Sequence, residues 1–189
     1  MIVQFCGLSG VGKTTLAIRV KKKLIHYGAR VEIIDGDEYR KTLCNDLGFS
    51  KEDRLENIRR LGFVASKLSS HGIISVISAI NPYQEARDEL KRLYNNVKTI
   101  YLDCPVNILK QRDTKGLYKR AELPAEHVEK VSNLTGINDQ FDIPNNPDLY
   151  INTALKSIEE SAEELFCFIT RDRAFHFTSF KPESLFAEH

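Results

Sequence analysis

The sequence predicts an α/β protein with a doubly wound, mostly parallel five-stranded sheet and helices on both faces. Short apolar runs alternate with longer amphipathic segments, and strands that alternate with helices imply right-handed βαβ crossovers. The runs are rich in Val and Ile and hardly alternate with polar residues, which is typical of strands buried on both faces of a parallel sheet. With 189 residues, 42% apolar and 28% charged, the chain can bury the core of one such domain.

The elements follow from these runs in chain order. The expected strands are residues 2–6, 31–34, 73–80, 97–102 and 149–151. The expected helices are residues 13–27, 52–71, 82–95, 105–111 and 154–170. In the first helix, the apolar residues Leu16, Val20, Leu24 and Tyr27 recur at helical spacing and predict its buried face. Before the second helix, Ser50 is followed three residues later by Asp53, a capping pattern that predicts where the helix begins.

The chain divides into a domain at residues 1–170 and a tail at residues 171–189, which is rich in Phe and shows no chemistry. Within the domain, residues 113–147 are polar and carry three prolines. A segment of this length without strand character is usually functional or mobile, so we expect a mobile lid there.

Composition and charge exclude several classes of protein. There are 27 basic and 26 acidic residues, so the net charge of +1 gives no electrostatic basis for binding nucleic acid or an anionic membrane. No stretch approaches the ~20 apolar residues of a membrane span, and the N-terminus lacks the pattern of a secretory signal. The four cysteines form no CxxC pair. We therefore expect a cytoplasmic protein whose partners are neither nucleic acids nor membranes.

The strongest motif is GLSGVGKT at residues 7–14, a complete GxxxxGK[ST] phosphate loop between a predicted strand and a predicted helix. Its glycines let successive N–H groups point at phosphate oxygens, and the helix N-terminus favours the same anion. Lys13 would reach the β- and γ-phosphates, and the Thr14 hydroxyl would hold Mg²⁺. The sequence thus predicts a bound nucleoside triphosphate with Mg²⁺ as cofactor. The candidate ATP-binding residues of the loop are Gly7, Leu8, Ser9, Gly10, Val11, Gly12, Lys13, Thr14 and Thr15.

Other features separate the classes of phosphate-loop protein. A GTPase would need a guanine-reading NKxD, and the sequence has none. Large ATPases usually carry an apolar strand that ends in Asp, whereas residues 73–80 continue into Asn81 and Pro82. The short chain then favours a small-molecule kinase.

A second cluster of charged residues follows the second predicted strand. Asp35 and Asp37 lie at the carboxyl end of that strand, the edge at which such sheets bind ligands. Either carboxylate would activate an acceptor hydroxyl or orient the metal's waters, so both are candidate catalytic residues with Lys13. A helix N-cap explains Asp37 alone about as well. Farther on, Arg54 and Asn57 are three apart on one helical face, suited to an anionic group and a hydroxyl.

Five segments together make a resemblance specific: GLSGVGKTT, DGDEYR, LCNDLGFSKEDRLENIRR, RDTKGLYKRA and TGINDQF. In order and spacing they resemble the adenylyl-sulfate kinases, which use ATP to phosphorylate the ribose 3′-hydroxyl of adenylyl sulfate (APS). The resemblance covers residues 2–170. It implies a phosphate-loop kinase fold, APS and ATP as substrates, phosphoadenylyl sulfate (PAPS) and ADP as products in sulfate activation, and a homodimer.

The resemblance also implies roles for residues on the acceptor side. Asp37 and Arg40 would contact APS, Phe49 would stack on its adenine, and Arg54 and Asn57 would bind its phosphosulfate. A planar base joined to an anionic mixed anhydride needs an aromatic face and guanidinium groups, so the residue types agree with the role.

Further substrate contacts and three departures come from the same resemblance. Arg112 would support ATP, Lys115 would contact APS from the lid, and Ile80, Asn81 and Leu134 would complete the APS site. Asn81 replaces a serine that is common in the family and is a phosphoserine in some members, so transfer would be directly in line. Leu134 replaces an aromatic residue, and the lid at residues 115–134 is a few residues longer than usual. These departures leave two alternatives open: a kinase for another small nucleotide or metabolite, and a non-catalytic nucleotide-binding partner.

Overall fold

The structure, a computed structural model, describes residues 1–171, so the tail prediction lies outside the described residues except for Arg171. The five strands are β1 (Ile2–Cys6), β2 (Val31–Asp35), β3 (Ile74–Ser78), β4 (Val97–Asp103) and β5 (Leu149–Asn152). They form one sheet in the order β2-β3-β1-β4-β5, and every neighbouring pair is parallel. All residues of the central strand β1 are buried. The predicted doubly wound parallel sheet is confirmed.

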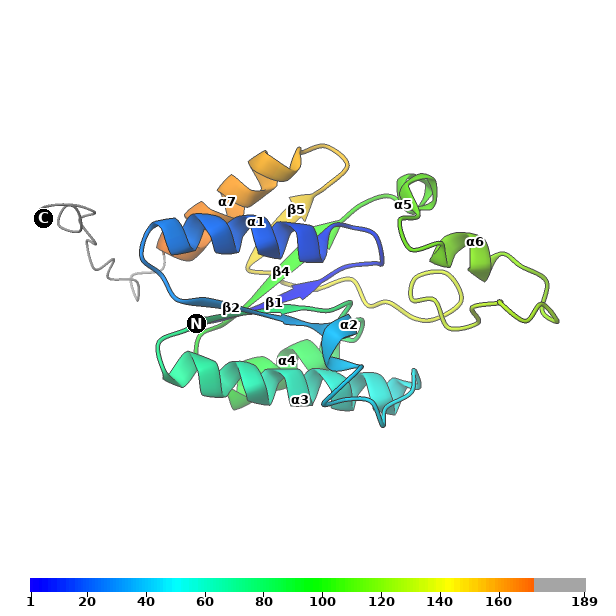
Figure 1. The fold of residues 1–189 in the computed structure, drawn as a ribbon, viewed down its shortest axis with the longest axis horizontal. Coiled ribbons are helices and arrows are strands. Elements are labelled where there is room, and N and C mark those ends of the chain that lie inside the picture. Colours follow the sequence, from blue (N-terminus) through cyan, green and yellow to red (C-terminus); the bar gives the residue numbers. More distant parts are fainter. Residues whose placement is uncertain (172–189) are drawn as a thin grey trace, which may run out of the picture.

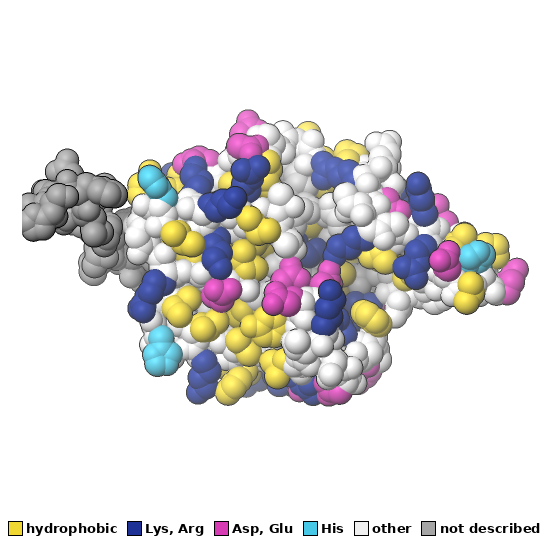
Figure 2. All heavy atoms as spheres, viewed as in Figure 1, with side chains coloured by type: hydrophobic (Ala, Val, Ile, Leu, Met, Phe, Trp, Pro, Cys, Tyr) yellow, Lys and Arg dark blue, Asp and Glu magenta, His cyan; other side chains and the backbone are white. Residues whose placement is uncertain are grey.

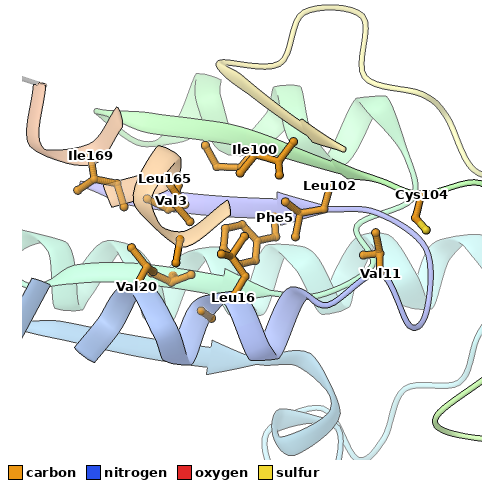
Figure 3. Packing of buried hydrophobic residues seen from close by; sticks show 14 of the residues in the cluster. Val3, Phe5, Val11, Leu16, Val20, Ile100, Leu102, Cys104, Leu165 and Ile169 are labelled. Atoms are coloured by element: carbon orange, nitrogen blue, oxygen red, sulfur yellow. The ribbon is translucent and has the colours of Figure 1, made fainter. Parts of the chain in front are cut away.

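Two pairs of long helices cover the sheet. Helices α1 (Lys13–His26) and α7 (Ile158–Arg171) lie on one face, and α3 (Lys51–Ser70) and α4 (Gln84–Leu93) lie on the other (Figure 1). On the first face, Leu16 from α1 and Leu165 from α7 pack with Phe5 of β1 (Figure 3). On the second face, Leu61 from α3 and Leu90 from α4 belong to a separate buried cluster. The sheet is therefore apolar on both sides, as its unbroken Val- and Ile-rich strands predict.

Local chemistry explains how α3 begins and packs. The Ser50 hydroxyl accepts a hydrogen bond from the Asp53 N–H at 3.1 Å, which is the predicted cap. A Cβ placed on Gly62 would lie 2.9 Å from Leu90 Cγ, so a glycine there lets α3 and α4 approach closely.

Four predicted elements are shorter in the structure. The helix predicted at residues 13–27 is α1, which ends at His26, so Tyr27 lies past its last turn and is 52% exposed instead of buried. The strand predicted at residues 73–80 is β3, which ends at Ser78 because the chain turns away to meet the phosphate loop: the Gly7 N–H donates to the Ile80 carbonyl at 3.1 Å. The helix predicted at residues 82–95 is α4, which begins at Gln84. The helix predicted at residues 154–170 is α7, which begins at Ile158.

The sequence did not predict two short helices. Helix α2 (Gly36–Tyr39) follows β2 directly and is capped by the Asp35 carboxylate. Helix α6 (Leu117–Ala121) comes after the predicted helix α5 (Val106–Arg112) and lies within the proposed lid, residues 113–147. The lid extends from the carboxyl end of the sheet (Figure 1). Its mobility stays a prediction.

The surface and the cysteines agree with the composition. Lys, Arg, Asp and Glu side chains are interspersed over the face drawn in Figure 2. Within residues 1–171, no helix has the length and apolar character of a membrane span. All four cysteines are free thiols, and three of them are buried. The described residues contain no group of three or more His, Cys, Asp or Glu side chains placed to hold a metal ion by themselves.

Candidate active site

The main cleft, of about 570 Å³, lies at the carboxyl end of the sheet. It is lined by the phosphate loop, the ends of β2 and β3, the start of α3 and the lid. A second cavity of about 70 Å³ adjoins it, and we call this the acceptor pocket. Its wall residues are Gly36, Asp37, Arg40, Phe49, Arg54, Asn57, Ile58, Ala79, Ile80, Asn81 and Pro82. Asp37, Phe49 and Arg54 line both spaces, so the two form one continuous site.

The phosphate loop has the backbone that its glycines predict. Gly10 and Gly12 have φ values of 77° and 100°, in the left-handed region that favours glycine. A Cβ on Gly7 would lie 2.3 Å from the Leu102 carbonyl oxygen, so no larger residue fits there. The Lys13 ammonium donates to the carbonyls of Gly7 and Leu8, both at 2.8 Å. Removal of this ammonium from water, together with the nearby positive charge of Lys115, lowers the pKa of Lys13 to about 7.

Oxygen atoms from three elements meet beside the loop. The Thr14 hydroxyl at the start of α1 donates to Asp35 Oδ2 at 2.8 Å and lies 3.2 Å from Ser78 Oγ. The other Asp35 oxygen accepts from the N–H groups of Asp37 and Glu38, which caps α2. A carboxylate and two hydroxyls are hard oxygen donors of the kind that Mg²⁺ prefers, so these residues fit the metal that ATP requires.

Asp37 and Lys115 form an ion pair across the cleft, from α2 to the lid. Both side chains are more than half exposed, so the pair is open to replacement by a charged ligand. The structure thus brings two sequence-predicted residues together, 78 positions apart in the chain.

Two arginine guanidinium groups pack against the aromatic ring of Phe49. The guanidinium carbon of Arg40 lies 4.5 Å from the ring centroid and that of Arg54 lies 5.5 Å from it. The ring is 53% exposed although it borders the cleft, which leaves apolar surface for a planar ligand. Arg54 is itself buried, donates to the carbonyls of Phe49 and Asn133, and pairs with Asp139 at 2.8 Å.

Buried polar atoms without a partner mark the same region. They are Asn57 Oδ1 and Asn81 Oδ1 beside the acceptor pocket and Thr135 Oγ1 beside the main cleft. Buried polar atoms are nearly always hydrogen-bonded in native structures, so these three atoms beside the cavities have hydrogen-bonding capacity left for a ligand.

The lid contacts the phosphate loop at two points. The Tyr118 hydroxyl donates to the Ser9 carbonyl at 2.8 Å. Gly136, with φ of 82°, lies so close to Leu8 that a Cβ would come within 2.5 Å of Leu8 Cδ2. Leu134, the residue that by the resemblance replaces an aromatic one, is 4% exposed and lines the cleft.

Four predicted ATP residues do not line the cleft. Arg112 donates to the Thr153 carbonyl at 2.9 Å beyond β5, and Val11 is buried in the core. Gly7 and Leu8 contribute main-chain geometry and packing. Of the predicted set, the main cleft brings together Ser9, Gly10, Gly12, Lys13, Thr14, Thr15, Asp35, Asp37, Phe49, Arg54, Ile80, Lys115 and Leu134. Arg40, Asn57 and Asn81 line the acceptor pocket.

Sequence reasoning missed other residues of the site. Ser78 follows from no motif. Asp139 lies inside the TGINDQF segment, but its ion pair with Arg54, 85 positions earlier in the chain, was not predicted. Tyr118 lies inside the RDTKGLYKRA segment, so the segment was found but the role of the tyrosine was not. Arg120 lines the cleft from the same segment.

A phosphate loop on a parallel sheet, facing a polar acceptor pocket across one cleft, defines a phosphate-loop kinase. Comparison with known proteins identifies the family within this class: residues 1–152 match the family model described as adenylylsulphate kinase. The chain belongs to the adenylyl-sulfate kinase family of ATP-dependent phosphotransferases, which confirms the resemblance drawn from the motifs.

Individual relatives agree. An adenylyl-sulfate kinase of Microcystis aeruginosa is 42% identical over 164 residues, covering 87% of this chain and 88% of the relative. The structure of an APS kinase of Mycobacterium tuberculosis in complex with AMPPNP and APS superposes with a TM-score of 0.82 at 36% identity, covering 89% of this chain and 96% of that one. A hexameric APS kinase of Thiobacillus denitrificans has a TM-score of 0.68 at 26% identity, with 93% of this chain and 29% of that one covered.

Proposed function

We propose that this protein is an adenylyl-sulfate kinase, which transfers the γ-phosphoryl group of ATP to the ribose 3′-hydroxyl of APS and releases PAPS and ADP. One observation carries the proposal: an aromatic ring flanked by two guanidiniums lies in the same cleft as an intact phosphate loop. A planar base joined to an anionic phosphosulfate is the ligand that such a ring and such cations suit.

On the ATP side, the phosphate loop would bind the triphosphate through its main-chain N–H groups and Lys13. Lys13 would exchange its present carbonyl partners for phosphate oxygens, and its positive charge would stabilise the transferred phosphoryl group. Thr14, with Asp35 and Ser78 beside it, would hold Mg²⁺. When bound, the metal would neutralise charge on the phosphates.

On the acceptor side, Asp37 is the better candidate for the base. Both Asp35 oxygens already accept hydrogen bonds, from Thr14 and from the start of α2. Within residues 1–171, the Asp37 carboxylate is paired only with the exposed Lys115. In the step proposed, the 3′-oxygen attacks the γ-phosphorus, the bond from that phosphorus to the β-phosphate oxygen breaks, and the hydroxyl proton passes to Asp37. Lys115 would then be free to contact the bound anion.

The lid would exclude water that would otherwise hydrolyse ATP. Its contacts through Tyr118 and Gly136 support this role, because they join the lid to the loop that holds the phosphates. A homodimer and a cytoplasmic location remain expectations from the sequence.

An acceptor panel tests the proposal. Purified protein with Mg-ATP is offered APS, AMP, adenosine and several sugars, and the product is located by phosphorus NMR. We expect turnover with APS alone at micromolar concentration and a new phosphate on the 3′-oxygen. Faster turnover of another acceptor would reassign the substrate, and omission of Mg²⁺ should abolish turnover of every acceptor.

A further inference from the structure

The wall of the acceptor pocket contains a residue in an uncommon conformation. Asn81 has φ of 48°, in the left-handed region, and is 1% exposed. Its carbonyl accepts from Arg87 Nη1 at 2.7 Å, and its Nδ2 donates to Gln4 Oε1 at 3.0 Å. Both the main chain and the side chain of Asn81 are therefore held by other residues.

Gln4 determines which way the Asn81 amide points. Gln4 is fully buried on the central strand β1, and its Nε2 donates to the Arg87 carbonyl at 3.1 Å and to Thr99 Oγ1 at 3.0 Å. A carbonyl can only accept, so Gln4 must direct its NH₂ group to Arg87 and its oxygen to Asn81. Asn81 must in turn direct its NH₂ group to Gln4. Its Oδ1 is then left as the buried oxygen without a partner.

Arg87 fixes the main chain of the same turn. Its guanidinium is buried, and its Nη2 donates to Gln84 Oε1 at 2.9 Å and to the Asp142 carbonyl at 2.8 Å. These partners are main-chain or neutral amide oxygens rather than carboxylates. A buried cation held in this way is costly, so its retention indicates a structural requirement at the turn.

We propose that Gln4 and Arg87 are positioning residues that orient Asn81 so that its Oδ1 accepts a hydrogen bond from a hydroxyl or amino group of the acceptor nucleotide. Asn57 Oδ1, also buried and without a partner, lines the same pocket and matches a ligand with more than one donor. The inference rests on the proposed function for the identity of the acceptor. It adds two residues outside the pocket wall that neither the motifs nor the pocket geometry had indicated.

The test compares steady-state kinetics of Gln4→Met with the wild type. This variant keeps the length of the side chain but removes both polar ends of its amide group, Oε1 and Nε2. We expect KM for APS to rise about tenfold, as for the loss of one well-placed hydrogen bond, while KM for ATP and kcat stay within about twofold. Thr99→Val, which removes one of the two partners of Gln4 Nε2, should raise KM for APS by a smaller factor, about threefold.

Two controls separate positioning from general damage. Ser75→Ala removes another buried hydrogen bond, to the Ala65 carbonyl at 3.1 Å, and should lower the melting temperature without changing KM for APS. In an Asn81→Ala background, Gln4→Met should have no further effect on KM for APS, because no amide remains to be oriented.

The outcomes are distinct. The positioning role would be overturned, while the proposed function stands, if Gln4→Met left KM for APS unchanged. It would also be overturned if Gln4→Met raised KM for APS equally in the wild-type and the Asn81→Ala backgrounds. A wild type that does not turn over APS would overturn the proposed function and this inference with it. If Gln4→Met does not fold, the Thr99→Val result decides: an unchanged KM for APS contradicts the inference.

Discussion

The two halves of the cleft are built in different ways. The phosphate loop is a continuous segment, and Lys13 at its end contacts carbonyls only five and six positions earlier. The acceptor half is assembled from distant segments: Arg54 of α3 donates to the carbonyl of Asn133, 79 positions away. A local motif therefore specifies ATP binding, whereas acceptor binding depends on the tertiary structure. Substitutions in one half should change the kinetics of one substrate far more than those of the other, except at the residue on which transfer itself depends.

Lys13→Ala should have the largest effect. The ammonium is the only cation placed within the phosphate loop itself, so its loss removes stabilisation of the transferred group, and we expect kcat to fall about a thousandfold. Lys21→Ala, on the same helix, removes an ammonium paired with Glu32 on the surface and should leave kcat unchanged. Initial rates at saturating ATP and APS measure both. A kcat within tenfold of the wild type in Lys13→Ala would contradict the role.

Arg54→Ala should affect the acceptor half alone. We expect KM for APS to rise about a hundredfold and KM for ATP to change less than threefold. The reason is that the buried Arg54 guanidinium would donate a charge-assisted hydrogen bond to the anionic phosphosulfate of APS. The melting temperature should also fall, since Asp139 loses its partner. Arg59→Ala, an exposed arginine of the same helix, is the matched control. Equal changes in both KM values would erase the distinction between the halves.

The pH dependence of ATP binding tests the environment of Lys13. Its pKa of about 7 lies below the ordinary value of 10.5, so the Lys13 side chain becomes neutral above pH 7. Bound phosphates favour the charged form, so binding above pH 7 must take up a proton. The affinity for ATP should then fall by up to about tenfold per pH unit between pH 7.5 and 9. Calorimetry of ATP binding in buffers of different ionisation enthalpy measures the proton uptake. If Lys13→Met took up the same proton on binding ATP, the uptake would belong to another group.

Phe49→Leu should have the smallest effect of the four. Loss of an aromatic face against a base removes about 0.5–1.5 kcal/mol, so KM for APS should rise between about twofold and tenfold. Phe63→Leu replaces an equally exposed ring on α3 outside both cavities and serves as the control. The same rise in both variants would show that the effect is not one of stacking.

The sequence predicted the locally encoded parts of the molecule better than the parts that are assembled from distant segments. The strands, the long helices and the phosphate loop were predicted because their signals are local: unbroken apolar runs, helical periodicity and a continuous motif. Helix α2 was missed because four residues show no period; its formation depends on the Asp35 cap. Helix α6 was missed for the same reason, since its stability comes from Asp113 accepting the Tyr118 and Lys119 N–H groups.

Asp37, Arg54 and Asn57 were also indicated by their positions at a sheet edge and on one helical face. The other acceptor residues were named only through the resemblance of whole segments to a family. Their supports could not be named at all, since the contacts of Gln4 with Asn81 and of Asp139 with Arg54 join positions that share no motif. Short-range patterns carry no information about such pairs, and the three-dimensional structure is needed to find them.

The most direct test of the central claim is ADP release from Mg-ATP in a coupled assay, with and without APS. We expect release that requires APS, that disappears in Lys13→Ala, and that is matched mole for mole by 3′-phosphorylated product. ATP that binds to the protein but is not turned over faster when APS is added would contradict the claim that these two halves form an adenylyl-sulfate kinase.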